Sequence, residues 1–126
     1  MKYAVDKKEQ FVLFTLMEEK LDSTLSPQLK SELLTVHAEG YKNLILDMAS
    51  VKYADSSGLS ALLVGNRAFG EEGGVFILSS LQEHVLKLMK ISMLDKVFKV
   101  VEDNEAAAEA VFIHEIEQGA EKDEEE

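Results

Sequence analysis

Apolar residues recur along this chain with two different spacings, which predicts strands that alternate with helices. The chain begins with two runs rich in β-branched and aromatic residues, Tyr3–Asp6 and Phe11–Met17, separated by the polar segment 7–10. This pattern is typical of two strands joined by a tight loop. Asn43–Met48 and Val75–Leu78 each contain a continuous apolar run, as expected of strands that are covered on both faces.

Two amphipathic helices are predicted in the first half of the chain. The first begins at Ser26-Pro27, where a hydroxyl can cap the helix and proline occupies the first helical position, and it stops at Gly40. The second begins near Ser56-Ser57 and ends at Gly70. The residues expected to face the core from these helices are Leu29, Leu33, Val36, Leu59, Leu62, Leu63 and Phe69.

The second half of the chain adds two helices and a weaker strand. Ser80 with Glu83 three residues later forms a capping-box pattern that opens a third helix, with Leu81, Val85 and Leu88 on one face. Lys96–Val101 is predicted as the last strand and Asn104 to about Glu117 as the last helix. The order is β-β-α-β-α-β-α-β-α, which predicts an α/β domain with a mostly parallel mixed sheet and helices packed on it.

Composition narrows the class of protein. The 126 residues suit one domain, and 46% hydrophobic with 29% charged residues is the balance of a globular chain. The absence of cysteine from the sequence excludes disulfides, thiol catalysis and cysteine-ligated metals. A net charge of −11 argues against nucleic acid or an anionic membrane as partner. Without a long apolar run or a secretory signal, we expect a cytoplasmic protein.

The negative charge is concentrated at the C-terminal end. Residues 115–126 contain seven acidic residues and one lysine, and beyond Gly119 only Ala120 is apolar. We therefore expect residues 1–117 to form the domain and residues 118–126 to form a solvated, disordered acidic tail.

One short segment, Asp55-Ser56-Ser57-Gly58-Leu59, carries most of the candidate chemistry. Gly58 has no Cβ, so a bulky partner can approach the backbone closely there. The hydroxyls lie at a helix N-terminus, where unpaired N–H groups and the helix dipole favour negative charge. A phosphoryl group on Ser57 would be tolerated there and would add about −1.5 to −2 of charge. Taken alone, the segment is more typical of an ordinary helix cap.

The segment resembles the phosphorylation motif of the bacterial anti-sigma factor antagonists, the small proteins that define the STAS domain. This resemblance implies that Ser57 is phosphorylated by the anti-sigma factor, a histidine-kinase-like ATPase that acts as a serine kinase. It also implies that Asp55 lies in the same recognition surface. Leu21-Asp22 looks like the family's Gly-x-Leu-Asp segment, with Glu19 in place of the glycine.

The likeness extends in element order over about residues 3–116. Ile91-Ser92-Met93-Leu94 is similar to the family's Ser-Gly-Leu stretch after the third helix, with Met93 where glycine is usual. The residues that the resemblance assigns to partner binding are Asp22, Asp55, Ser56, Ser57 and Gly58. Met93 and Leu94 are expected to lie near the motif and to present an apolar contact to the partner.

The resemblance implies a binding module rather than an enzyme. The unmodified chain would bind the anti-sigma factor, phosphorylation of Ser57 would release it, and a phosphatase would reset the cycle. ATP and magnesium would belong to the kinase, so this chain is expected to need no cofactor. The alternative is a STAS module of another complex, such as a stress-sensing assembly or lipid-transport machinery, in which the serine is not phosphorylated.

Enzyme functions fit the sequence less well than a binding module does. An aspartic protease needs two Asp-Thr/Ser-Gly turns, whereas here a second serine intervenes after Asp55. A serine hydrolase would need His37, His84 or His114 to reach Ser57. Asp47 follows a strand as in receiver domains, but the acidic pair and lysine that a receiver requires are missing. The sequence has no phosphate-cradling glycine loop, and its isolated histidines do not have metal-ligand spacing.

Overall fold

The computed structural model describes the backbone of residues 1–125 and the side chains of residues 1–119, and it has a mixed α/β architecture. The main sheet has the strand order β1-β2-β4-β6-β7. Its strands are β1 (Tyr3–Lys7), β2 (Val12–Leu16), β4 (Asn43–Asp47), β6 (Val75–Ser79) and β7 (Lys99–Val101). β1 and β2 form the expected antiparallel hairpin, and every other neighbouring pair is parallel. The predicted mostly parallel sheet is confirmed.

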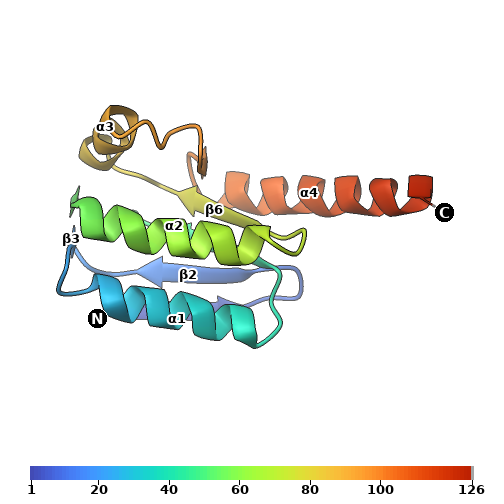
Figure 1. Cartoon of the computed structure of the whole chain (residues 1–126), viewed down its shortest axis with the longest axis horizontal. Coiled ribbons are helices and arrows are strands. Elements are labelled where there is room, and N and C mark those ends of the chain that lie inside the picture. Colours follow the sequence, from blue (N-terminus) through green and yellow to red (C-terminus); the bar gives the residue numbers. More distant parts are fainter. Residues whose placement is uncertain (126) are drawn as a thin grey trace.

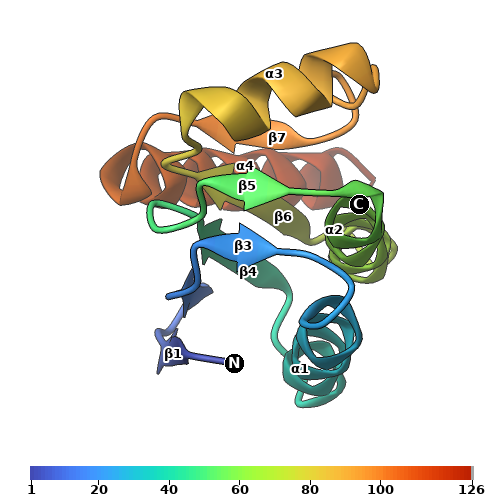
Figure 2. The ribbon, with the colours of Figure 1, turned by 90° about the vertical axis from the view of Figure 1, so that its left-hand side faces the viewer.

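A second, two-stranded sheet was not part of the predicted order. β3 (Lys20–Leu21) and β5 (Tyr53–Ala54) pair in parallel, and Figure 2 shows them side by side at one end of the molecule. The pairing places Leu21 beside Ala54. It therefore brings the chain that leads into the first helix next to the chain that leads into the second.

Helices cover both faces of the main sheet (Figure 1). α1 (Ser26–Ala38) and α2 (Ser56–Gly70) lie together on one face, α4 (Asn104–Glu125) lies on the other, and α3 (Glu83–Ile91) packs beside β5. The position of β4 between two layers of helices explains why its sequence is continuously apolar. Leu44 and Leu46 join the core beneath α1 and α2, whereas Ile45 joins the core beneath α4.

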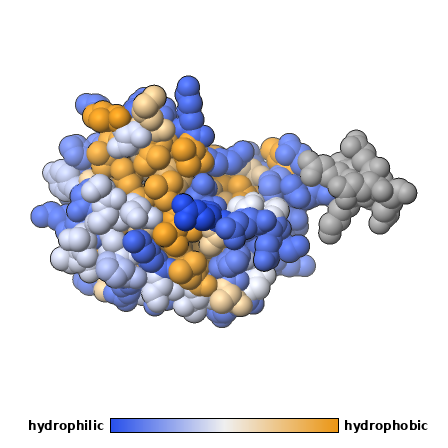
Figure 3. Space-filling view, in the orientation of Figure 1, coloured by the Kyte–Doolittle hydropathy of each residue, from blue (hydrophilic) through white to orange (hydrophobic). Residues whose placement is uncertain are grey.

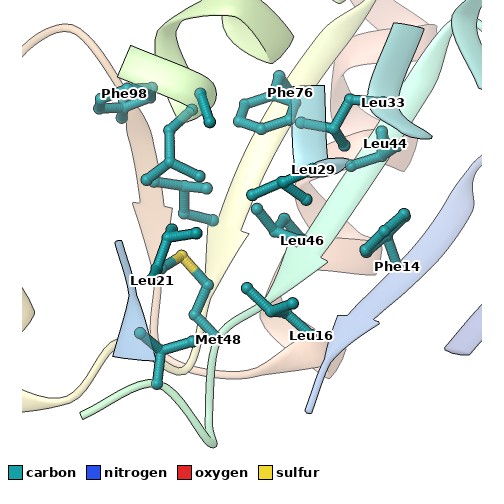
Figure 4. Close-up of a cluster of buried hydrophobic side chains, with 14 of the residues drawn as sticks. Phe14, Leu16, Leu21, Leu29, Leu33, Leu44, Leu46, Met48, Phe76 and Phe98 are labelled. Atoms are coloured by element: carbon teal, nitrogen blue, oxygen red, sulfur yellow. The ribbon is translucent and has the colours of Figure 1, made fainter. Parts of the chain in front are cut away.

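The larger core lies between the sheet and the helices α1 and α2 (Figure 4). Most of the predicted inward-facing residues are buried in it, namely Leu29, Leu33, Val36, Leu59, Leu62, Phe69 and Val85. Leu63, Leu81 and Leu88 are only half-buried and pack against its edge. Met89 on α3 is fully buried, as expected of a methionine that fills the core.

Two predicted helix caps are wrong. Ser26 is the first residue of α1 rather than its cap, because a helical turn already begins at Asp22, whose carbonyl accepts from the N–H of Ser26 at 2.9 Å. Ser80 does not cap α3, which begins at Glu83 after Gln82. Ser80 has a left-handed φ of 60°, and its N–H donates to Val101 as the chain turns out of β6.

The last predicted strand and helix have different bounds in the structure. The strand is shorter than Lys96–Val101, because the N–H groups of Val97 and Phe98 donate to Leu94 within a turn. The helix is longer, and its backbone continues through residue 125. The segment 118–126 that we expected to be disordered thus starts inside α4. Glutamate, lysine and alanine are good helix formers, and extending a helix is much easier than starting one.

The contact between α2 and β6 yields a prediction about packing. A Cβ added at Gly65 would lie 2.6 Å from a ring carbon of Phe76, which is buried in the core. We expect Gly65→Ala to lower the free energy of unfolding by about 1 to 2 kcal/mol, because overpacking outweighs the gain in helix propensity. Urea denaturation measures the change.

The matched control is Gly70→Ala, at the end of the same helix, where an added Cβ meets nothing within 4 Å. This variant should be as stable as the parent or slightly more stable. Equal effects of the two substitutions would contradict the packing argument.

Candidate functional site

Asp55 organises the start of α2. It is the N-cap residue, and its Oδ1 accepts from the N–H of Gly58 at 3.0 Å. The same oxygen accepts from the hydroxyl of Ser57 at 2.6 Å. The carboxylate thus caps the helix, as the ordinary interpretation of the motif predicted, and it also orients the serine hydroxyl.

Ser57 has a second hydroxyl beside it. The Oγ of Ser26 lies 3.2 Å from the Oγ of Ser57 and 2.7 Å from the carbonyl oxygen of Asp22. Ser57 is partly exposed, whereas Ser26 is only 2% exposed. The Ser57 hydroxyl therefore contacts a buried group of α1, while Ser57 itself remains partly exposed.

The backbone at Gly58 lies directly against β3. A Cβ at this position would come within 2.4 Å of the carbonyl oxygen of Leu21, which belongs to the backbone and cannot move aside. The N–H of Asp55 also donates to this carbonyl, at 3.2 Å. The close neighbour of Gly58 is therefore the chain's own strand β3, and not the bulky partner that the sequence led us to expect.

Asp22 lies next to this turn. Its Oδ1 accepts from the N–H of Thr24 at 3.0 Å and from the Thr24 hydroxyl at 2.5 Å. These two hydrogen bonds lower the pKa of Asp22, although the nearby Asp55 carboxylate opposes the effect. The two acids from separate segments, Asp22 and Asp55, are thus brought together.

The pKa of Asp55 is also lowered. The largest cause is the hydrogen bond from the Ser57 hydroxyl, followed by the backbone N–H of Gly58, and the N–H of Ser23 contributes as well. Asp55 therefore stays ionised and keeps the Ser57 hydroxyl oriented, rather than holding a proton of its own.

The other predicted site residues are Ser56, Met93 and Leu94, and among the described residues none of them forms a side-chain hydrogen bond with Ser57. Ser56 is exposed at the first turn of α2. Met93 is 80% exposed with a φ of 58°, in the left-handed region where glycine is favoured, and Leu94 is half-buried against the core. Figure 2 shows the end of α3, just before these residues, above the start of α2.

Exposed apolar side chains surround this end of α3. Ile91 is 80% exposed and Val97 is 47% exposed, on either side of Met93 in the sequence. Figure 3 shows apolar surface gathered between α3 and α2. We call Ile91, Met93 and Val97 the α3 apolar patch. A large exposed apolar group of this kind is typical of a surface that contacts another molecule.

One residue that sequence reasoning did not assign to the site, Ser26, contacts it in the structure. The parallel pairing of β3 with β5 brings it there. A two-residue strand leaves no periodic pattern, so the sequence contains no indication of this contact.

The three histidines, which a serine hydrolase would need near Ser57, have neighbours other than Ser57. His37 packs edge-on against Phe69, His84 packs against Tyr53, and His114 forms a hydrogen bond with the Gly73 carbonyl at 2.7 Å. Asp47 accepts from the side chain of Asn104 at 2.8 Å and helps attach α4 to the sheet.

The described residues contain neither a candidate metal site nor a candidate membrane span. Among them, no group of three or more metal-ligating side chains could hold an ion. Within the same part of the chain, no helix is both long and apolar enough to cross a membrane.

The fold and the site together define an α/β domain that carries a serine turn at the N-terminal start of a helix. The family model of the STAS domain matches residues 2–108. This chain belongs to the STAS domain family. The family that the sequence resembled is therefore confirmed.

Several relatives carry a functional description. The chain is 29% identical over 110 residues to BtrV of Bordetella bronchiseptica, a protein described as a candidate anti-sigma factor antagonist, and the match covers 87% of this chain and 94% of BtrV. A candidate anti-sigma factor antagonist from Thermotoga maritima has a similar crystal structure, with a TM-score of 0.78, 23% identity, and coverage of 86% and 93% of the two chains.

The phosphorylated form of SpoIIAA, a Bacillus cell fate determinant, is also similar in fold. Its TM-score is 0.67 at 20% identity, with 86% of this chain and 99% of SpoIIAA covered. At this level of identity, the likeness to the solved structures establishes the fold.

The hydrogen bonds of Asp55 predict how stability depends on pH. Because the pKa of Asp55 is lowered by folding, the unfolded chain takes up the proton first as the pH falls. The carboxylate should therefore stabilise the fold above its ordinary pKa of about 3.9, and this stabilisation should be lost as the pH falls through that value and the lower folded one. Asp55→Asn should make the loss of stability between about pH 5 and pH 3 smaller.

Urea denaturation at several pH values measures this effect. The control is Asp95→Asn, which makes the same chemical change at an exposed position in the loop after α3. If Asp55→Asn followed the parent's pH dependence as closely as the control does, the assigned role of the carboxylate would be wrong.

Proposed function

We propose that this protein is an anti-sigma factor antagonist controlled by phosphorylation of Ser57. In its unmodified form it binds an anti-sigma factor that is also a serine kinase, and so frees a sigma factor for transcription. The single observation that carries this proposal is the geometry of Ser57, whose oxygen is oriented by Asp55 at 2.6 Å on a partly exposed turn. Membership of the STAS family and the description of BtrV support it.

The proposed modification is a phosphoryl transfer from ATP held by the partner. The Ser57 oxygen forms a bond to the γ-phosphorus, and the bond from that phosphorus to the oxygen bridging to ADP breaks. The hydroxyl proton leaves as the new bond forms. Asp55 orients this hydroxyl, but its lowered pKa makes it a poor final acceptor, so the proton passes to a base of the kinase or to water.

Phosphorylation changes the charge of the contact surface. Ser57 loses the proton that it donates to Asp55 and gains a group of about −1.5 to −2 charge. This group lies beside two carboxylates, Asp22 and Asp55, in a surface that must lose water when the partner binds. A 10- to 100-fold loss of affinity needs only about 1.4 to 2.8 kcal/mol, which one misplaced charge can supply.

The α3 apolar patch supplies the binding energy that phosphorylation opposes. Its members Ile91 and Met93 are both 80% exposed, so burial against a partner removes most of their surface from water. Fully burying one side chain of this size contributes about 1.5 to 3 kcal/mol. A patch of this kind at the same end of the molecule as the serine lets one partner contact both.

The proposal predicts a specific chemical product. After incubation with the ATP-binding anti-sigma factor kinase of the same organism and magnesium ATP, the intact protein should gain the mass of one phosphoryl group. Peptide mapping should place the group on Ser57, and Ser57→Ala should gain none. Modification of Ser57→Ala to the same extent as the parent would contradict the assignment.

Binding separates the proposal from a STAS module that is not switched by phosphorylation. Ser57→Asp should bind the kinase about 10- to 100-fold more weakly than the parent in isothermal titration calorimetry. Ser31→Asp, which adds the same charge at an exposed position of α1, should bind as the parent does. Equal affinity of Ser57→Asp and the parent would favour the unswitched module.

The role of the α3 apolar patch is tested by Met93→Asn. Asparagine tolerates the left-handed backbone at this position, so the fold should be retained while the apolar side chain is lost. Affinity for the kinase should fall about tenfold. Phe112→Asn, at a 56% exposed apolar position on α4, is the control and should leave affinity unchanged. An equal loss in both variants would show that the patch has no special role.

A further inference from the structure

The buried hydroxyl of Ser26 has a single proton and two acceptors within reach. Its Oγ lies 2.7 Å from the carbonyl oxygen of Asp22 and 3.2 Å from the Oγ of Ser57. The first distance is that of a good O–H···O hydrogen bond, whereas the second is longer than usual. In the unmodified protein the proton therefore points to Asp22, and the proton of Ser57 points to Asp55.

The Asp22 carbonyl does not depend on the Ser26 hydroxyl. It also accepts from the backbone N–H groups of Ser26 at 2.9 Å and of Leu25 at 3.1 Å. A carbonyl oxygen has two lone pairs, so these two N–H donors can satisfy it without the hydroxyl. The Ser26 hydroxyl can turn away from it while the first turn of α1 stays hydrogen-bonded.

A phosphoryl group on Ser57 would be the stronger acceptor. Its phosphorus is bonded to the Ser57 Oγ, which is already 3.2 Å from the Ser26 Oγ, and its terminal oxygens lie two bonds beyond the Ser57 Oγ. Hydrogen bonds to a charged acceptor are roughly twice as strong as those between neutral groups. Ser26 is only 2% exposed, so water competes little for its proton.

We propose that Ser26 is a phosphate-binding residue of the Ser57 site: its hydroxyl turns from the Asp22 carbonyl to the phosphoryl group when Ser57 is modified. This inference rests on the proposed phosphorylation of Ser57. The donated proton compensates part of the repulsion from Asp22 and Asp55 and holds the phosphoryl group against the start of α1. Ser26 thus links the modified serine on α2 to the loop between β3 and α1.

The test uses the full chain with phosphoserine incorporated genetically at position 57, so that no kinase is needed. The phosphorus NMR shift is followed against pH to obtain the second pKa of the phosphate. A hydrogen-bond donor stabilises the dianion and lowers this pKa. Ser26→Ala should therefore raise it by about half a pH unit relative to the parent, and Ser31→Ala, at an exposed position further along α1, should not.

A second variant covers the case in which Ser26→Ala perturbs the fold. Ser26→Cys is similar in shape but is a weak donor, so it should raise the same pKa. Unchanged phosphate pKa values in both Ser26 variants would overturn the proposal and place the phosphoryl group in solvent. Failure of any kinase to modify Ser57 would instead overturn the proposed function, because this titration does not involve a kinase.

Discussion

The site depends on the close contact between Gly58 and the carbonyl oxygen of Leu21. A Cβ at residue 58 would lie only 2.4 Å from that oxygen, so glycine alone lets the first turn of α2 meet β3. The same carbonyl accepts from the N–H of Asp55 at 3.2 Å. This contact joins two segments more than thirty residues apart in the sequence and brings Asp22, Ser26, Asp55 and Ser57 to one place.

Asp55 has a structural role at the start of α2 and, in the proposed cycle, a functional one as well. A carboxylate at the cap of α2 satisfies backbone N–H groups, which any helix start requires. Because its oxygen also accepts from the Ser57 hydroxyl, the same group sets the direction in which the serine oxygen is exposed. The helix-cap interpretation and the regulatory interpretation of the motif are therefore compatible, since one carboxylate serves both.

The arrangement suits a protein that signals by changing its surface charge. The main sheet and its two covering layers form a rigid base, while the serine turn and the α3 apolar patch lie at one end of it (Figures 2 and 3). In the proposed cycle, the apolar patch provides affinity and the charge on Ser57 cancels part of it. Neither element needs a large movement of the fold, because charge alone changes the free energy of the contact.

The order of the main strands and helices was predictable from the sequence, because long apolar patterns such as those of Asn43–Met48 and Val75–Leu78 report directly on burial. The motif Asp55–Leu59 was recognisable for a similar reason, since helix caps and glycine have strong local preferences.

The contact of Ser26 with Ser57 was not predictable. It arises from the pairing of β3 with β5, two strands of two residues each, which are too short to leave a pattern and whose partners are set by tertiary packing. The burial of the Ser26 hydroxyl was not predictable for the same reason. Its sequence context indicates a helix cap, whereas the folded chain buries its hydroxyl beside the serine of another helix.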